Sequence, residues 1–442
     1  MQRLTRVLGL PSAVVLGLGS ILGTGLFVSL GLAAGVSGYA VPLAIILAAT
    51  VAMANGMSSA SLAANHPVSG GTYEYGYTYL GRPYGFFAGT MFLAAKSASA
   101  ATAALGLIGY IANLIPAISG FMVNALAAGV VVVLTALVAS GLRRSTKATV
   151  VSVSITILGI VILVIYAWRA AAGAVSGAGE PAIDAGQTAA GVRSWLRALA
   201  ENPLGFLQGA ALVFVAFTGY GRIATLGEEV KEPSRTIPRA IVTTVAVVTI
   251  LYVSVAIVSI GVITPAELAT AARENQAPLE LVARRAGGMV PLVAVLLAAV
   301  TALFGVLLNL ILGLSRVVLA MGRRRDLPGF LARIDDRRSS PVAAVVVVGV
   351  LVALMALFGS VELNWSFSAL TVLVYYALTN LSALFVPSES KRIHPVVSVL
   401  GVVGCLALAF AIGPEVIIPG AAVLGFVVVW YILATHFRKG RT

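Results

Sequence analysis

Long apolar stretches recur along the whole of this chain and leave few folds open to it. About twelve of them reach the roughly 17–25 residues that an α-helix needs to cross a bilayer. Lipid offers no partner to free backbone N–H and C=O groups, so each stretch is expected to be helical. We therefore predict an all-α integral membrane protein with about twelve transmembrane helices. The expected spans lie near 10–36, 41–64, 84–112, 121–140, 148–170, 203–227, 240–263, 288–320, 341–359, 365–386, 394–412 and 415–435.

The few polar side chains exclude several classes of function. Charged residues make up 10% of the chain, against roughly 25% in an average soluble protein. One cysteine, Cys405, and three scattered histidines give no set of metal ligands. The spans hold no paired carboxylates and the chain has no nucleotide-binding loop, so we expect no catalytic residues, no metal, no cofactor and no enzyme. The first span is too long for a signal peptide and lacks a convincing cleavage site.

Basic residues predict how the chain crosses the membrane. The net charge is +13, and most of the 29 lysines and arginines fall in every second loop. By the positive-inside rule these loops face the cytoplasm, together with the N- and C-termini. We expect a multi-pass protein of the cell (plasma) membrane whose partner is the lipid bilayer. The basic loop Arg323-Arg324-Arg325 lies inside a polytopic protein, so we expect no nucleic acid partner.

Two spans contain glycine clusters near their middle. The first holds Gly19-Ser20-Ile21-Leu22-Gly23-Thr24-Gly25, and the sixth holds Phe217-Thr218-Gly219-Tyr220-Gly221. Glycines at membrane depth allow a broken helix, which survives only beside protein or a cavity. The alternative is that these glycines only let neighbouring helices pack closely. Because both clusters begin a block of five spans, we predict that helices 1 and 6 are broken.

Five is an odd number, so the second block of five spans is expected to cross the membrane upside down relative to the first. This arrangement is an inverted repeat, and broken helices at matching positions mark the substrate site of such transporters. We expect repeat one at about 9–170 and repeat two at about 203–386. Together they would form a ten-helix transport core at 1–390, followed at 391–442 by helices 11 and 12 and a cytoplasmic tail.

Several motifs, in the same order, resemble the amino acid–polyamine–organocation transporter superfamily. The segment Gly19 to Phe27 is similar to the signature of its first helix, and Phe217 to Tyr220 to part of its sixth. Further matches are Pro67 to Tyr75 after the second span, Glu228 to Pro233 with Ile237 to Arg239 after the sixth, and Ser315 to Pro328 at the end of the eighth. The resemblance covers about residues 9–330. It implies the five-plus-five fold of the leucine transporter and transport by alternating access.

The resemblance also implies how an amino acid would be held. Its carboxylate would meet the backbone amides of three successive residues, Gly23, Thr24 and Gly25. Its ammonium group would meet the backbone carbonyls of Ile21, Val215 and Thr218. Many members carry a large aromatic residue at the position of Val215, whereas here Phe214 and Phe217 flank that position. A helix start suits an anion and unwound carbonyls suit a cation, so both ends of a zwitterion are matched without a charged side chain.

The absence of acidic side chains from the spans predicts the class of substrate. No Asp or Glu lies in the interior of an expected span, so small neutral amino acids are favoured over polyamines and other di-cations. The alternatives are an amine or organocation transporter of the same fold, and a channel or a transporter-like sensor. The sequence leaves open which amino acid is carried, whether by uniport, exchange or proton symport, and the oligomeric state.

Lys96 stands in the middle of the third span, where a charge costs about 3 kcal/mol on insertion scales. Such residues usually mark ion or proton pathways, although a structural lysine that bonds carbonyls is the other interpretation. Proton-coupled relatives often carry a lysine on helix 5, and Thr156 occupies the matching position here. We therefore predict that Lys96 takes the place of a bound cation near the contact of helices 1 and 8. Transport would be sodium-independent, either proton-coupled or by exchange, with protons as possible co-substrates.

Overall fold

A computed structural model describes residues 9–66, 71–115, 118, 120–141, 146–175, 191–224, 230–275, 277–335, 340–387 and 392–418, with single residues up to 431. The motif positions Pro67 to Gly70, Glu228 and Glu229 lie outside these residues, as does most of the expected span at 415–435. The described residues form helices joined by short turns, and an isolated β-bridge pairs Asp335 with Ser340.

The first half of the chain forms helices that match the expected spans. They are α1 (Leu10–Ile21), α2 (Thr24–Phe27), α3 (Ser29–Ser37), α4 (Val41–Asn65), α5 (Thr72–Tyr75), α6 (Arg82–Ala112), α7 (Phe121–Ala139), α8 (Thr146–Val175), α9 (Val192–Glu201), α10 (Pro203–Phe217) and α11 (Gly221–Ala224). The shorter turns are η1 (Gly38–Ala40), η2 (Gly76–Leu80) and η3 (Thr218–Tyr220).

The second half is helical in the same way. Its helices are α12 (Pro233–Val262), α13 (Pro265–Thr270), α14 (Pro278–Arg285), α15 (Met289–Arg323), α16 (Val342–Phe358), α17 (Val361–Leu384) and α18 (Pro395–Phe410), with the turns η4 (Ala271–Asn275) and η5 (Gly329–Ala332). Proline in the first turn starts many of them, because its missing N–H and fixed φ suit that position.

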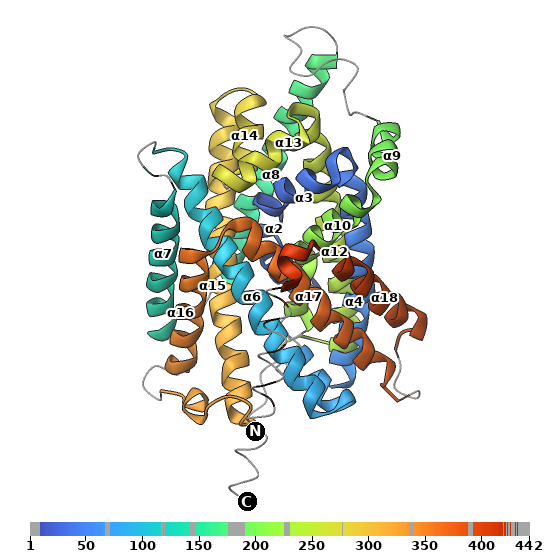
Figure 1. The fold of residues 1–442 in the computed structure, drawn as a ribbon, viewed down its shortest axis with the longest axis vertical. Coiled ribbons are helices and arrows are strands. Elements are labelled where there is room, and N and C mark those ends of the chain that lie inside the picture. Colours follow the sequence, from blue (N-terminus) through green and yellow to red (C-terminus); the bar gives the residue numbers. More distant parts are fainter. Residues whose placement is uncertain are drawn as a thin grey trace, which may run out of the picture.

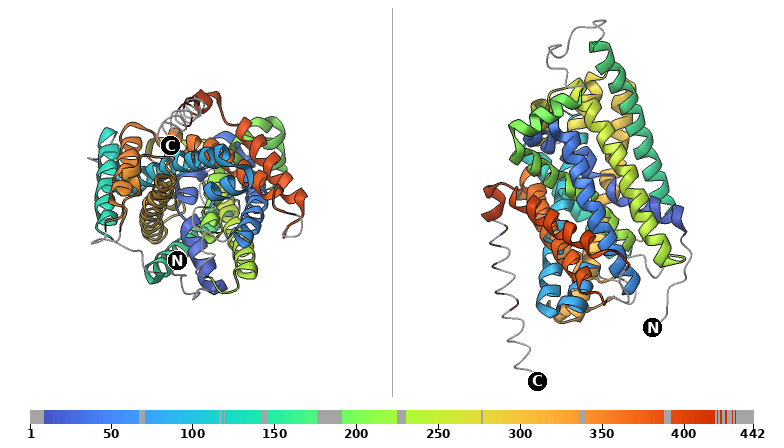
Figure 2. Two further views of the ribbon diagram at one scale, coloured as in Figure 1. Left: turned by 90° about the horizontal axis from the view of Figure 1, so that it is seen from below. Right: turned by 90° about the vertical axis from the view of Figure 1, so that its right-hand side faces the viewer.

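Nine stretches of the described chain are long and apolar enough to cross a membrane, and α16 and α18 are shorter apolar helices. Helices α7 and α16 lie together at one edge of the molecule in both Figure 1 and Figure 2. Their outward side chains are apolar yet exposed, for example Val132, Val133 and Val350 at 53–60%. An apolar surface of this kind suits contact with lipid tails. The prediction of an all-α membrane protein is therefore confirmed.

The two interrupted helices run through the middle of this bundle. The α1–α3 and α10–α11 segments contact each other and are surrounded by α4, α6, α8, α12, α15 and α17 (Figure 1). Helices α13 and α14 cover α3 at one end. The covering is close, since a Cβ on Gly31 would lie 2.6 Å from the Leu268 carbonyl oxygen. Helices α13 and α14 therefore pack directly on α3 at that end of the bundle.

Candidate functional site

The first interruption is a true break in the helix. Helix α1 ends at Ile21, and Leu22 (φ −70°, ψ 106°) and Gly23 (φ 172°, ψ −123°) are extended before α2 begins at Thr24. The Gly23 carbonyl accepts the N–H groups of Leu26 and Phe27, both at 3.0 Å. Among the described residues, no hydrogen bond uses the N–H groups of Gly23, Thr24 and Gly25.

The hydroxyl of Thr24 lies beside these amides. Its residue is 3% exposed, and Oγ1 has no hydrogen-bond partner among the described residues. A buried hydroxyl without a partner costs free energy that a ligand with an acceptor oxygen would recover. The break therefore presents three amides and one hydroxyl, all donors, to the closed interior of the protein.

The second interruption is milder than the first. Helix α10 ends at Phe217, and the chain continues as the 3-10 turn η3 and the one-turn helix α11. The Val215 carbonyl accepts both the N–H of Thr218 and its Oγ1, the latter at 2.7 Å. These bonds tighten the last turn of α10. The sixth span is thus interrupted as an α-helix but does not unwind as the first does.

The two interruptions touch through glycine. A Cβ on Gly25 would lie 2.2 Å from the Ala216 Cβ, and one on Gly219 would lie 2.3 Å from the Ser20 carbonyl oxygen. A Cβ on Gly23 would meet the Val306 side chain of α15 at 2.5 Å. Hence these glycines fill a packing role as well as marking a break. The interpretation as close helix packing and the interpretation as a broken helix both apply to the first span.

The three carbonyls that the resemblance assigned to the ammonium group are already bonded to hydroxyls. Tyr252 donates to Ile21 O at 3.1 Å, and Tyr376 donates to Thr218 O at 3.2 Å. The Thr218 carbonyl also accepts the N–H of Gly221, so it and the Val215 carbonyl each carry two bonds. The Ile21 carbonyl carries only the bond from Tyr252 in the described structure, which leaves it one free lone pair.

The two tyrosines are candidate site residues that the sequence did not reveal. They lie in apolar spans, and nothing in the sequence separates a tyrosine that faces the break from one that faces a neighbouring helix. Phe214 and Phe217 hold them in place, since the rings of Phe214 and Tyr376 lie 5.9 Å apart and those of Phe217 and Tyr252 lie 5.4 Å apart. Both phenylalanines are fully buried. They therefore support the two tyrosines through these ring contacts.

Lys96 reaches the second interruption. It lies on α6, is 9% exposed, and its Nζ donates to Thr218 Oγ1 at 2.6 Å. We expected it near the contact of the first and eighth spans, but its amine bonds to the sixth. Thr156, on α8, bonds to the Ser152 carbonyl of its own helix at 2.8 Å. No hydrogen bond of the described residues joins Thr156 to Lys96.

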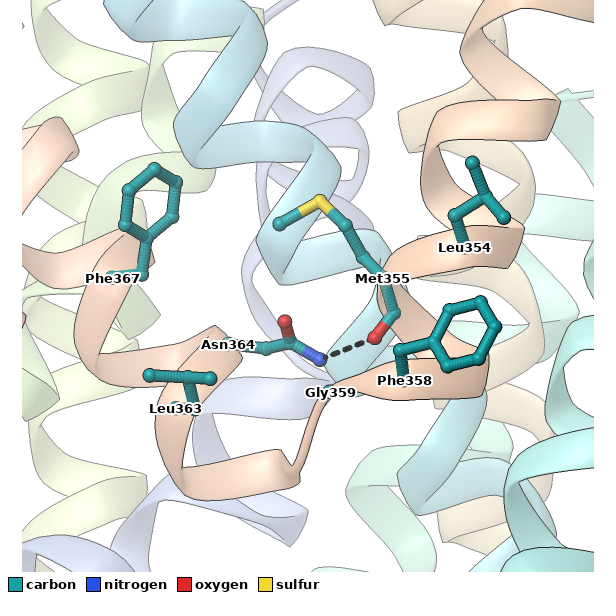
Figure 3. Close-up of a pocket in the computed structure, with 7 residues that line it drawn as sticks. All are labelled: Leu354, Met355, Phe358, Gly359, Leu363, Asn364 and Phe367. Carbon is teal, nitrogen blue, oxygen red and sulfur yellow. Dashed lines mark hydrogen bonds between the residues drawn. The ribbon is translucent and has the colours of Figure 1, made fainter. Parts of the chain in front are cut away.

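A separate hollow of about 380 Å³ lies between α16 and α17 (Figure 3). It is lined by Leu354, Met355, Phe358, Gly359, Leu363, Asn364 and Phe367. The Asn364 side-chain amide turns to the Met355 carbonyl at 3.0 Å, so the polar group there is already bonded. This apolar hollow shares no residue with the two interruptions.

Sequence comparison relates this geometry to known proteins. A family described as "Amino acid permease" matches residues 8–437. An uncharacterized transporter of Mycobacterium tuberculosis is 42% identical over 97% of this chain and 91% of its own length. A branched-chain amino acid permease of Bacillus subtilis is 25% identical over 80% and 75%. A chloroplastic cationic amino acid transporter of Arabidopsis thaliana is 26% identical over 86% and 65%.

Proposed function

The chain belongs to the amino acid permease family of the amino acid–polyamine–organocation superfamily, and from this premise we propose which substrates it carries and how. It is a secondary active transporter of small neutral amino acids that works by alternating access and does not use sodium. It lies in the plasma membrane with both termini in the cytoplasm. Its transport core at 1–390 is a five-plus-five inverted repeat, with repeats at about 9–170 and 203–386.

One observation supports the proposal most directly. The amides of Gly23, Thr24 and Gly25 and the Thr24 hydroxyl gather at the break between α1 and α2, without an acceptor in the described structure. Donors that converge from a helix start suit a carboxylate. An amino acid carboxylate would therefore fill these donors when it binds.

The ammonium group of the substrate has a partner in the Ile21 carbonyl. That oxygen lies at the C-terminal end of α1, where the helix dipole favours a cation. It keeps a free lone pair beside the bond from Tyr252. The Val215 and Thr218 carbonyls already accept two hydrogen bonds each. They would contact the ammonium group only after the Thr218 hydroxyl leaves Val215 O or the Tyr376 hydroxyl leaves Thr218 O. We therefore assign the first contact of the ammonium group to Ile21.

Lys96 supports sodium independence and small neutral substrates. Its ammonium group bonds to Thr218 beside the second interruption, and the described spans hold no carboxylate near it. A fixed cation there repels a sodium ion and a cationic side chain alike. An amine transporter would need the opposite charge at this place. Exchange and proton coupling both remain compatible with the arrangement.

Ligand-induced thermal stabilisation of the purified protein tests the carboxylate contact. Alanine, serine, valine and leucine are each compared with their methyl esters and with the matching decarboxylated amines. We expect at least one free amino acid to raise the melting temperature, because ligand binding stabilises the folded state. Its ester and its amine should not. Equal stabilisation by the ester or the amine would refute the carboxylate site.

A further inference from the structure

A buried carboxylate joins three segments at the end of the molecule that carries the basic loops. Asp326, 1% exposed, follows the C-terminus of α15. It accepts hydroxyls from Tyr73 at 2.8 Å and Tyr77 at 2.5 Å, and Arg82 Nη2 lies 3.2 Å away. Burial and the bond to Asp326 raise the pKa of both tyrosines, that of Tyr77 to about 12, so both hydroxyls stay protonated and donate at physiological pH. These bonds join the segment after α4 to the ends of α6 and α15.

Arg324 is held at the same junction. It forms an ion pair with Glu74, and its guanidinium lies 4.5 Å from the centre of the Tyr77 ring and 5.7 Å from that of Tyr73. Stacking on aromatic faces orients an arginine without using up its outer N–H groups. Arg324 is therefore fixed in direction and can still bind another acceptor.

The junction borders a hollow of about 340 Å³ lined by Tyr77, Arg82, Arg323, Arg324 and Arg325. Among the described residues, Asp326 pairs with Arg82 and Glu74 pairs with Arg324, which leaves two of the four lining arginines without a paired carboxylate. Arg323 and Arg325 form no ion pair with any described residue, and the buried Nε of Arg82 has no hydrogen-bond partner among them. A concave site with surplus arginine donors has the character of an anion site.

The backbone at Arg325 gives an independent reason to look for a ligand. Its φ is +60°, the left-handed conformation in which helices commonly end and which glycine usually occupies. The turn is closed by bonds from Arg325 N to Gly322 O at 3.0 Å and from Asp326 N to Met321 O at 2.9 Å. Basic residues in the last turn of α15 interact favourably with the negative end of the helix dipole. This interaction does not explain why an arginine occupies position 325, where the left-handed backbone favours glycine.

We propose that this hollow binds a phosphate group at the membrane surface. Arg323 and Arg325 supply the free guanidinium groups, and Arg82 and Arg324 supply donors already held by Asp326 and Glu74. Arginine forks match phosphate oxygens in pairs, so four of them around one hollow suit a phosphate better than a carboxylate. Figure 1 shows the start of α6 and the end of α15 at the same lower end of the bundle. The positive-inside rule assigns this end to the anionic cytoplasmic leaflet.

The proposed ligand is a phosphate of net negative charge, which can come from an anionic lipid headgroup or from a soluble anion, and one experiment separates the two. Phosphatidylcholine is the reference, because the choline cation neutralises its phosphate. The full chain is placed in nanodiscs of phosphatidylcholine alone, or of phosphatidylcholine mixed with phosphatidylglycerol, each with and without inorganic phosphate. Melting temperatures are then compared. We expect phosphatidylglycerol, inorganic phosphate, or both, to raise the melting temperature over phosphatidylcholine alone. If neither raises it, the proposal is wrong.

Two variants locate the effect at the hollow. Arg325→Gly removes one guanidinium and at the same time relieves the left-handed backbone, so this variant should fold at least as well as the parent without the anion. Arg323→Gln removes the other free guanidinium. Both should lose most of the stabilisation that phosphate or phosphatidylglycerol gives to the parent. Retention of the full effect in both variants would overturn the site.

A matched control separates this site from general surface charge. Arg239 is exposed in the first turns of α12, on a segment that also faces the cytoplasm under the proposed topology. Arg239→Gln should keep the full stabilisation. If all three variants lose it equally, the charge of the whole surface and not the hollow is responsible, and the proposal fails. The assay does not depend on which amino acid the protein carries.

Discussion

At the scale of single residues, the site depends on the absence of side chains as much as on their presence. Gly25 and Gly219 let the first and sixth spans meet at backbone distance, which brings the first break against Ala216 and the end of α1 against η3. Sequence alone pointed to both glycine clusters and to Lys96. It did not show that Lys96 Nζ bonds to Thr218, because that contact joins residues 122 positions apart.

Gly25→Ala should damage the site by adding one methyl group. Its Cβ would lie 2.2 Å from the Ala216 Cβ, so α2 and α10 must move apart, at a cost of about 1–3 kcal/mol for overpacking. We expect amino acid affinity to fall about tenfold or more, which corresponds to about 1.4 kcal/mol. Gly129→Ala is the control, because that glycine lies within α7 with open space around it. Unchanged affinity in Gly25→Ala would contradict the packing described here.

Lys96→Met should separate transport from stability. The substitution keeps an unbranched side chain, shorter by one atom, and removes a charge that is expensive to bury, so the melting temperature should hold or rise. Transport should fall about tenfold if the ammonium group stands in for a bound cation. Thr218→Val, which removes the hydroxyl that Lys96 contacts, should impair transport in the same direction. A fully active Lys96→Met protein would make the lysine a structural residue.

At the scale of elements, the starts of helices were easier to predict from the sequence than the contacts between helices. The sequence Thr264-Pro265-Ala266-Glu267 has the order of residues that typically starts a helix, and α13 begins there with a complete capping box. The positions of the apolar spans could be predicted because each run is long enough to stand out. Which face of each span meets which neighbour could not, because apolar residues surround most of these helices and Tyr252 and Tyr376 lie among them unmarked.

The capping box of α13 should be measurable as stability. Thr264 Oγ1 accepts the Glu267 N–H at 3.2 Å, and Thr264→Ala removes that bond at a cost of about 1 kcal/mol. Thr264→Ser keeps the cap and is the control. We expect a lower melting temperature for the alanine variant alone. Equal melting temperatures of the two variants would mean that the cap does not stabilise α13, which packs on α3.

The contribution of the α13 capping box to stability should also depend on pH. Burial raises the pKa of Glu267, but the bonds from Thr264 and the charge of Arg285 outweigh it and hold the pKa below its ordinary value of 4.5. A carboxylate whose pKa is lowered on folding stabilises the fold above its unfolded pKa, and this stabilisation is lost as the pH falls through the folded value. Glu267→Gln should therefore melt below the parent at pH 7 and approach it at strongly acidic pH. A constant difference across this range would rule out the ionised carboxylate as the cause.

At the scale of the whole molecule, the membership of the amino acid permease family and the all-α membrane fold are confirmed. The count of twelve helices and the inverted repeat stay predictions, since the last expected span lies mostly outside the described residues. Composition and run length were enough for the class of protein. The substrate could not be predicted in this way, because the proposed contacts to its carboxylate and ammonium groups are made by backbone groups at the break, which are the same for almost any side chain.

Uptake by the purified protein in liposomes tests whether it carries small neutral amino acids without sodium. The liposomes are preloaded with a mixture of unlabelled amino acids, and each labelled neutral amino acid is offered in turn, in sodium and in potassium medium, with and without the matching decarboxylated amine. We expect saturable uptake of at least one small neutral amino acid, equal in both media and little affected by the amine. Uptake that requires sodium, or that the amine suppresses better than the unlabelled amino acid does, would contradict it.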